Sequence, residues 1–295
     1  MVTVYVVDAF TTEPNTGNRA GVVLDADHLT TQDMQNIAAF AGYSETAFVL
    51  SPTDQSHDIH VRYFTPTNEV PICGHATIAT HFLRASLGSK SDYPLIAKTG
   101  AGNLSVSISD SKEGLMVSMV QGRVEFQPPF TPQQRDELAI ALGIKANDFA
   151  NLPIQIATTG HSKVMIPMLS RKTLDGLTPN KEKLKAISAE IDCNGFFPFV
   201  LEGSKQTPIT FGRMFAPAIG IDEDPVTGNA NGPAGAYLVH HNLIECEPEV
   251  HYWGHQGLAI NKPGRVLVSV NKVNSILKVS IAGQAVLIGK RETIS

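Results

Sequence analysis

Arg62-Tyr-Phe-Thr-Pro66, followed by Gly74-His-Ala-Thr77, returns later in the chain as Arg213-Met-Phe-Ala-Pro217, followed by Gly228-Asn-Ala-Asn231. The two Arg-containing segments are 151 positions apart, and the same offset relates a Phe-Val-Leu strand segment in the two halves. A repeat of more than a hundred residues indicates a duplicated domain rather than a short solenoid unit. The sequence therefore predicts two copies of one fold unit.

The two copies differ at two places, and these differences indicate where chemistry should be sought. A scaffold tolerates symmetry, whereas a reaction on one substrate usually does not. The interval from Arg to Gly is three residues longer in the second copy, and we expect the extra residues within Asp222-Glu-Asp-Pro-Val-Thr227. The offset also places Phe196 opposite Glu45, so Glu45 has no acidic counterpart.

Length and composition are those of a two-domain protein. The chain has 295 residues, enough for two domains that each bury a core. We expect a first repeat over 1–128, joined by a returning C-terminal strand at 280–295, and a second repeat over 129–279. The net charge is −5 and only 7% of residues are aromatic, with no basic run. This composition argues against nucleic acid as a partner.

The sequence also lacks the usual signals for export or membrane insertion. The first ten residues alternate like a strand and have neither the basic region nor the cleavage site of a signal peptide. No apolar run approaches the roughly 18 residues needed to span a bilayer. The three cysteines, with no C-x-x-C pair, fit reduced thiols. We therefore expect a cytoplasmic protein that does not enter a membrane.

Short strands separated by Gly, Pro, Asn and Asp make up most of the pattern, with a few helices at matching places. Capping residues predict helices from Thr30 to Gly42 and from Thr131 to Gly143, and another that has Pro179 as its first residue. The helix after Gly74 is apolar almost all round and must be buried. We expect an α+β fold with two pseudo-symmetric halves, each a curved barrel-like sheet around a central helix, and an active site in the cleft between them.

Both central helices are expected to begin at glycine turns. Their unpaired backbone N–H groups, at Gly74 and Ala76 in one copy and at Gly228 and Asn229 in the other, favour an anion. Together they could hold a substrate carboxylate or an enolate oxyanion. The alternative is that the glycines only permit tight turns. No Walker loop or G-x-G-x-x-G follows a strand, so a nucleotide site is not predicted.

Three side chains are candidates for catalysis. Glu45 lies where partial burial would raise its pKa and make it a general acid or base, unless it is simply a solvated junction residue. His75 lies on the first helical turn, where the dipole should keep the imidazole neutral; it could equally be an ordinary buried histidine. Asp224 is placed to orient a group at the second helix, whereas its neighbours Asp222 and Glu223 fit an acidic surface turn better.

Asn18 and His161 occupy equivalent turns in the two copies, and both are candidates for substrate binding or for simple turn formation. Cys73 could move a proton, but it fits a small apolar residue better. A racemase with two thiols is excluded, because the equivalent position is Thr227. His251 and His255 lack an acidic third ligand, so no metal site is predicted.

The segments Asn15-Thr-Gly-Asn18, Ser44-Glu45-Thr46, Gly74-His-Ala-Thr77 and Asp222-Glu-Asp-Pro-Val-Thr-Gly228 together resemble the phenazine-biosynthesis PhzF-like family. The resemblance covers the whole chain. It implies the diaminopimelate epimerase-like fold, a homodimer and no cofactor. It also implies a glutamate acid/base at Glu45, with the family's histidine and aspartate matching His75 and Asp224. The phenazine-type enzymes carry a serine where this chain has Asn229, which places their substrate in doubt here.

These observations predict a cofactor-independent isomerase or epimerase that moves a proton on a small carboxylate-bearing substrate. Glu45 would act as the general acid/base, and His75 and Asp224 would orient the substrate and stabilise charge. One alternative is a non-catalytic protein that binds small carboxylates in the same cleft. Another is a hydrolase that depends on Cys73.

Overall fold

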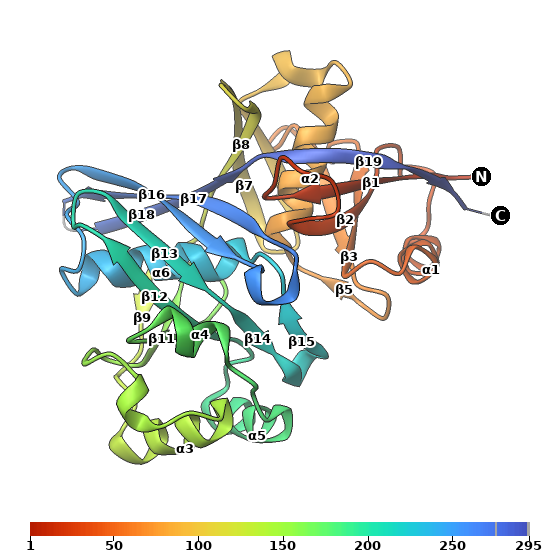
Figure 1. Ribbon diagram of the computed structural model, residues 1–295. Coiled ribbons are helices and arrows are strands. Elements are labelled where there is room, and N and C mark those ends of the chain that lie inside the picture. The colour runs from red at the N-terminus through yellow and green to blue at the C-terminus, as the bar shows by residue number, and fades with distance from the viewer. Residues whose placement is uncertain (275, 294–295) are drawn as a thin grey trace. The chain divides into compact units, whose positions relative to one another are not determined.

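The computed structural model describes residues 1–274 and 276–293, so the last two residues of the predicted returning segment 280–295 lie outside the described residues. Strands predominate, and helices pack against them (Figure 1). The chain divides into two compact units. The first contains Met1–Val120 and the C-terminal segment from Ala282, and the second contains Gln121–Ile281.

The sheet of the first unit combines strands from both ends of the chain. Seven strands pair one after another, and their six pairings are antiparallel, antiparallel, parallel, antiparallel, parallel and antiparallel. An eighth strand, β8 (Gly114–Val120), pairs antiparallel with the seventh. In that order the seven strands are β19 (Ala285–Glu292), β1 (Thr3–Ala9), β2 (Asn18–Val23), β3 (Glu45–Leu50), β4 (Ile59–Phe64), β6 (Leu95–Thr99) and β7 (Gly102–Ser111). The short β5 (Glu69–Val70) pairs with β4.

The second unit repeats the same series of pairings. Its seven strands also run antiparallel, antiparallel, parallel, antiparallel, parallel and antiparallel. In order they are β9 (Glu125–Phe126), β10 (Gln155–Thr158), β11 (Lys163–Pro167), β12 (Phe196–Gly203), β13 (Pro208–Gly212), β16 (Glu249–Gln256) and β17 (Gly264–Val273). The short β14 (Met214–Ala216) pairs with β12 and with β15 (Ile221–Asp224), and β18 spans Ile276–Gly283. The identical pairing order confirms that the units are copies of one α+β fold.

Each unit has one central helix that is buried along most of its length. In the first unit this is α2 (Gly74–Ser86), which packs against β1, β2, β3 and β8. In the second it is α6 (Gly228–His240), which packs against β10, β11 and β17. Neither Gly74 nor Gly228 has a positive φ, so each is an ordinary first helical residue rather than the glycine turn that the sequence suggested.

The remaining helices lie on the outside of the two sheets. They are α1 (Thr31–Ala41), α3 (Pro132–Leu142), α4 (Arg171–Asp175) and α5 (Lys181–Ile191), together with the 3₁₀ turns η1 (Ser89–Asp92), η2 (Ala146–Asp148), η3 (Pro217–Ile219) and η4 (Leu258–Ile260). Capping boxes at Thr30 and Thr131 begin α1 and α3 as predicted. The predicted start of α5 was wrong, because Asn180 caps this helix and Pro179 lies before the cap.

Two arginine–glutamate pairs correct the predicted position of the three extra residues. Arg62 binds Glu69 through Nε (2.8 Å) and Nη2 (2.7 Å), and Arg213 binds Glu223 in the same way at 3.0 and 2.7 Å. Each glutamate lies five residues before the glycine that begins its central helix. The extra residues therefore precede Glu223, in the part of the chain that contains η3, and the prediction that placed them within Asp222–Thr227 was wrong.

This register also gives Asp224 a counterpart in the first unit. Val70 pairs with Tyr63 between β5 and β4, and Asp224 pairs with Met214 between β15 and β14. Since Tyr63 and Met214 are 151 positions apart, Asp224 occupies the place of Val70. A carboxylate has thus replaced an apolar side chain at equivalent positions.

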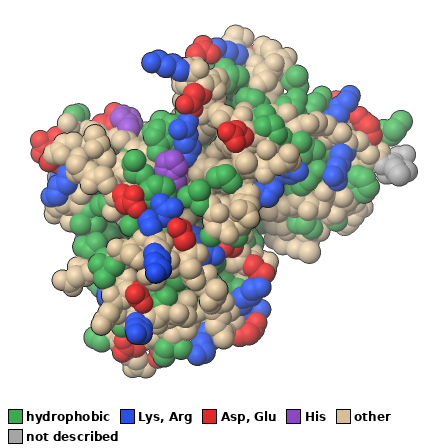
Figure 2. All heavy atoms as spheres, viewed as in Figure 1, with side chains coloured by type: hydrophobic (Ala, Val, Ile, Leu, Met, Phe, Trp, Pro, Cys, Tyr) green, Lys and Arg blue, Asp and Glu red, His purple; other side chains and the backbone are tan. Residues whose placement is uncertain are grey.

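The surface charges and the helix lengths agree with two predictions from the sequence, the lack of a basic run and the lack of a membrane-spanning segment. On the face drawn in Figure 2, the Lys and Arg side chains are interspersed with Asp and Glu. Within the described residues, no helix is both long enough and apolar enough to cross a bilayer.

Candidate active site

Glu45 and His75 form a buried ion pair in the first unit. Glu45 is the first residue of β3, and His75 is the second residue of α2. The Oε2 atom of Glu45 lies 3.2 Å from Nε2 of His75, and their side chains are only 13% and 7% exposed. The strand and the helix both pack in the core, so the backbone fixes the relative position of the two charged groups.

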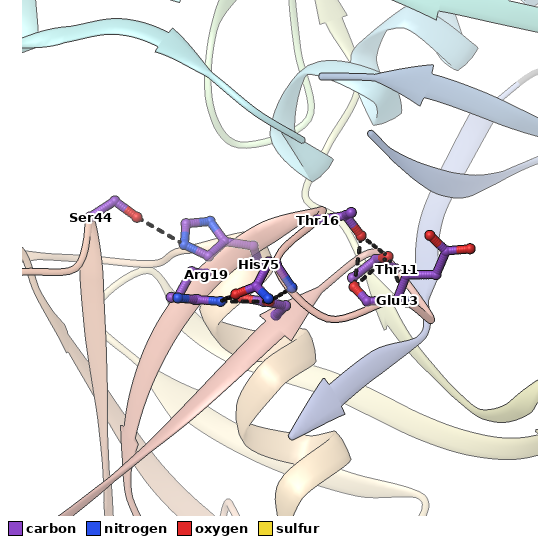
Figure 3. Close-up of polar contacts among 8 residues, drawn as sticks. Thr11, Glu13, Thr16, Arg19, Ser44 and His75 are labelled. Atoms are coloured by element: carbon purple, nitrogen blue, oxygen red, sulfur yellow. Dashed lines mark hydrogen bonds and ion pairs between the residues drawn. The ribbon is translucent and has the colours of Figure 1, made fainter. Parts of the chain in front are cut away.

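Two more side chains surround the imidazole. The Sγ atom of Cys73, the N-cap residue of α2, lies 3.3 Å from Nδ1 of His75. The hydroxyl of Ser44 lies 3.3 Å from Nε2, and Figure 3 shows it directed at the ring. Cys73 is therefore buried, as predicted, but it contacts a charged group and does more than fill apolar space.

The ionisation of Glu45 differs from the prediction. Burial raises the pKa of this carboxyl group, but the charge of His75 and hydrogen bonds from His75, Ser44 and Cys73 outweigh burial and lower the pKa below its usual value. The predicted rise was wrong, because the sequence does not show that a cation lies beside Glu45. At neutral pH the group is a carboxylate, ready to accept a proton.

The ionisation of His75 also differs from the prediction. Burial lowers its pKa, but Cys73 and Glu45 together raise it well above the usual value. The thiol of Cys73 is itself neutral at neutral pH, because burial and Glu45 raise its pKa. The charge that holds the proton on His75 is therefore that of Glu45. The prediction of a neutral imidazole was wrong, since an adjacent carboxylate outweighs the helix dipole.

The turn before β2 places Asn18 and is fixed by residues that the sequence analysis missed. Asn18 is 2% exposed and follows Gly17, whose φ of 64° is left-handed. Arg19 binds the buried Asp8 at 2.6 Å, and Asp8 also accepts the N–H of Asn15 at 2.7 Å. Figure 3 shows the Thr11–Thr16 hydroxyl contact that closes the preceding loop. In the sequence, the signal for this arrangement was Asp8 near the end of a predicted strand, followed by a turn that contains Asn15 and Asn18.

Gly74 and Ala76 lie on the first turn of α2, as predicted, and both are buried. The side chain of the N-cap residue Cys73 makes no capping hydrogen bond. Of the first four N–H groups of the helix, that of Thr77 bonds to the carbonyl of Cys73. The start of α2 thus lies directly beside the Glu45–His75 pair.

In the second unit, Asp224 lies at the start of α6. Its carboxylate accepts the hydroxyl proton of Thr227, the N-cap residue, and its carbonyl accepts from Nε2 of Gln256 at 2.7 Å. Asp222, in contrast, is an exposed partner of Lys181 at 2.5 Å. Glu223 is held by Arg213 and is not the surface residue that the sequence suggested, because its side chain is 10% exposed. Only Asp224 of the three is directed at the helix.

His161 lies next to a half-buried lysine, Lys163, that the sequence did not point to. Burial lowers the pKa of His161, and the charge of Lys163 lowers it further. Burial also lowers the pKa of Lys163, against the opposing effects of Cys193 and Asp224. The lysine stem packs on Gly195, where a Cβ atom would come within 2.3 Å of Cδ. The glycine that faces Lys163 reveals this lysine only in the structure, so the sequence held no signal for it.

The donor atoms of Glu45, Cys73 and His75 all lie within 4.8 Å of one another. A carboxylate, a thiolate and an imidazole at this spacing are suitable ligands for a divalent metal ion such as zinc. The chemistry derived below uses the same groups as an acid and a base, and the prediction of a protein without metal stays a prediction.

A family model described as phenazine biosynthesis-like protein, PhzC-PhzF, matches residues 7–291 of the chain. The chain belongs to the PhzC-PhzF family. The resemblance found in the sequence is thereby confirmed over nearly the whole length.

Relatives of this PhzC-PhzF member include named isomerases. The chain is 48% identical to the uncharacterized isomerase YddE of Escherichia coli O157:H7, over 97% of this chain and 96% of that protein. It is 31% identical to the trans-2,3-dihydro-3-hydroxyanthranilate isomerase of Pseudomonas chlororaphis, with the same coverage. These matches confirm the prediction of an isomerase at the level of enzyme class.

A solved structure confirms the predicted fold. The phenazine biosynthesis protein of the PhzF family from Bacillus anthracis is 35% identical and superposes with a TM-score of 0.90, covering 100% of this chain and 99% of that one. The fold is therefore diaminopimelate epimerase-like, as the sequence predicted.

Proposed function

We propose that this PhzC-PhzF family member catalyses a cofactor-independent proton transfer on a small carboxylate-bearing substrate, with Glu45 as the acid/base. The observation that carries the proposal is the buried Glu45–His75 pair, 3.2 Å apart, at the start of a central helix. A carboxylate that is ionised at neutral pH can remove a proton from carbon, and the carboxylic acid so formed, after exchange with solvent, can deliver a proton to another position.

His75 supplies the complementary charge. While Glu45 is ionised, the imidazolium stabilises it; when Glu45 takes up the proton, His75 is free to stabilise negative charge that develops on the substrate. The N–H groups of Gly74 and Ala76 would assist in binding an anionic group. We propose the same binding role for Gly228, Asn229, Asn18 and His161, and an orienting role for Asp224.

The proposed substrate class follows from two considerations. The start of a helix favours an anion, and the Pseudomonas relative is named for an isomerisation of trans-2,3-dihydro-3-hydroxyanthranilate, which carries a carboxylate. The identity between the chains is 31%, and the family resemblance implies a serine in phenazine-type enzymes where this chain has Asn229. We therefore propose a small carboxylate as the substrate class rather than that compound itself.

Solvent deuterium incorporation tests the proposal. The protein is incubated in heavy water with small cyclic and amino carboxylates, including trans-2,3-dihydro-3-hydroxyanthranilate, and hydrogen exchange at carbon is followed by mass spectrometry. We expect exchange with the wild type and a loss of about 10²- to 10⁴-fold in Glu45→Gln, the usual contribution of a general acid/base.

Glu69→Gln is the matched control, because it removes another ion-paired glutamate of the same unit. It should leave exchange unchanged. Full exchange by Glu45→Gln on a substrate of the wild type would show that another group is the base. Binding of a carboxylate by both proteins without any exchange would favour the non-catalytic binding protein.

A further inference from the structure

Gln121 reaches the start of α6 from the beginning of the second unit. Its Nε2 atom lies 3.2 Å from Oδ1 of Asn229 and 3.5 Å from the carbonyl oxygen of Gly228. Its Oε1 atom accepts the hydroxyl proton of Thr159 at 2.8 Å. Both ends of the Gln121 amide are therefore occupied by protein partners.

The partners allow only one orientation of this amide. The carbonyl oxygen of Gly228 can only accept a hydrogen bond, so the atom of Gln121 that faces it must be the nitrogen. The oxygen then faces Thr159, whose hydroxyl can donate. A flipped Gln121 would place two oxygen acceptors against each other at the start of α6.

Gly232 makes room for Gln121. A Cβ atom at this position would lie 1.7 Å from Oε1 of Gln121, and the three nearest atoms to that Cβ all belong to the Gln121 amide. The helix is thus shaped around the glutamine side chain, which limits its freedom to move away from Asn229.

The orientation of Gln121 determines that of Asn229. Because the Gln121 nitrogen donates, the Asn229 atom beside it must be the oxygen. The Nδ2 group of Asn229 then points away from Gln121, and it has no hydrogen-bond partner within residues 1–274 and 276–293. Asn229 is half-buried at the second position of α6, so this amide donor remains available to a bound molecule.

We propose that Gln121 is a positioning residue that fixes Asn229 as a hydrogen-bond donor to the substrate. The inference rests on the proposed function and refines its substrate class: the group that meets Asn229 is a hydrogen-bond acceptor, such as a carboxylate or enolate oxygen. A serine at this position could donate or accept. The NH₂ group of Asn229, held in this orientation by Gln121, can only donate and therefore binds acceptor groups, which distinguishes this site from one that carries a serine.

The orientation itself is tested without a substrate, by NMR of the side-chain amides in the full-length protein. The Asn229 NH₂ signals are assigned by their absence in Asn229→Ser. In the wild type we expect fast solvent exchange of the Asn229 NH₂ protons and slower exchange of those of Gln121. In Gln121→Glu, whose side chain can only accept, the Asn229 amide should turn over and its NH₂ protons should become protected.

Binding of anthranilate, as the probe, measures the consequence. In the Asn229 background, Gln121→Glu should weaken binding on the order of tenfold, and the neutral Gln121→Met should weaken it by about threefold, as expected for a hydrogen bond to a charged group. In the Asn229→Ser background both effects should nearly vanish, because a hydroxyl can rotate. A simple repulsion between the carboxylate introduced by Gln121→Glu and the anion would persist in both backgrounds, so it is separated by this double-mutant cycle.

The outcomes separate this inference from the proposed function. Protected Asn229 NH₂ protons in the wild type, no change in Gln121→Glu, or no shift of the Asn229 signals with anthranilate would each overturn the inference. Any of these results combined with exchange that needs Glu45 would leave the proposed function intact. Conversely, Asn229 signals that shift with anthranilate, without deuterium exchange of any carboxylate, would support the inference and contradict the proposed function.

Discussion

The charge on Glu45 and the charge on His75 depend on each other, and this coupling should appear in the pH dependence of stability. The pKa of Glu45 is lowered from 4.5, so its contribution is fully present above that pH and is lost as the pH falls through the lowered pKa. The pKa of His75 is raised well above 6.5, so its contribution is fully present below pH 6.5 and is lost as the pH rises through the raised pKa.

Glu45→Gln should therefore destabilise the protein most between pH 4.5 and 6.5. Removing one partner of a buried pair costs about 3–5 kcal/mol, and the difference from the wild type should shrink at higher pH as His75 loses its proton. Urea unfolding at several pH values between 5 and 9 measures this difference. Glu223→Gln, in the buried pair with Arg213, is the control; since arginine keeps its charge, its effect should not change across this range. A flat difference for Glu45→Gln would contradict the coupling.

At this scale the sequence selected Glu45 and His75 as candidates but did not predict their charges. Broken symmetry between the copies selected Glu45, and the start of an apolar helix selected His75. Their mutual distance was not visible, because 30 positions separate them in the chain. Each pKa was therefore predicted from one local effect, burial or the helix dipole, and the partner reversed both.

At the scale of a single element, α6 depends on the absence of a side chain at Gly232. Gly232→Ala should destabilise the protein by about 1–3 kcal/mol, because the new Cβ overlaps the amide of Gln121. The cost should be clearly smaller in a Gln121→Ala background, where the overlapping atoms are gone. Denaturant unfolding of the four proteins gives the coupling. Any penalty from placing alanine before Pro233 is common to both backgrounds and cancels. Equal costs in the two backgrounds would show that Gln121 does not occupy this space.

Helix ends could be predicted from sequence because capping is local. Thr30 and Thr131 bond within three residues of themselves, so their patterns carry the whole interaction. The insertion before Glu223 could not be placed in this way. Its position is set by the contact of Glu223 with Arg213, ten residues away, and spacing alone fits several alignments equally well.

For the whole molecule, the first unit depends on a strand from the far end of the chain. β19 pairs with β1 over the full length of β1, and Gln284 accepts the N–H of Phe10 at 2.8 Å. A chain that ends at Gly283 should lose hydrogen-exchange protection in β1 and β2 but keep it in β16 and β17. The lost pairing is comparable with the stability of a whole domain, about 5–15 kcal/mol. A chain that ends at Thr293 keeps β19 and should behave like the full chain. Loss of protection in both units, or in neither, would contradict this division.

The duplication was the most predictable property of the molecule, because the same motifs occur in both halves of the sequence. Both the Phe-Val-Leu segment and the Arg-x-Phe-x-Pro motif repeat at one offset, and the strand pairings repeat with them. What could not be predicted is the contribution of residues with no motif, such as Gln121 and Lys163. Each is recognised only by the glycine that faces it, Gly232 and Gly195, and that pairing requires coordinates.

The division of the first unit between the two ends of the chain has a consequence for biosynthesis. The second unit is continuous, from Gln121 to Ile281, so all of its residues are synthesised before the last strand of the first unit. Domains generally fold as units during translation. The unit that is synthesised first therefore has one side of β1 unpaired at that stage, and the unit that carries Glu45 and His75 is completed only after the second unit has been synthesised.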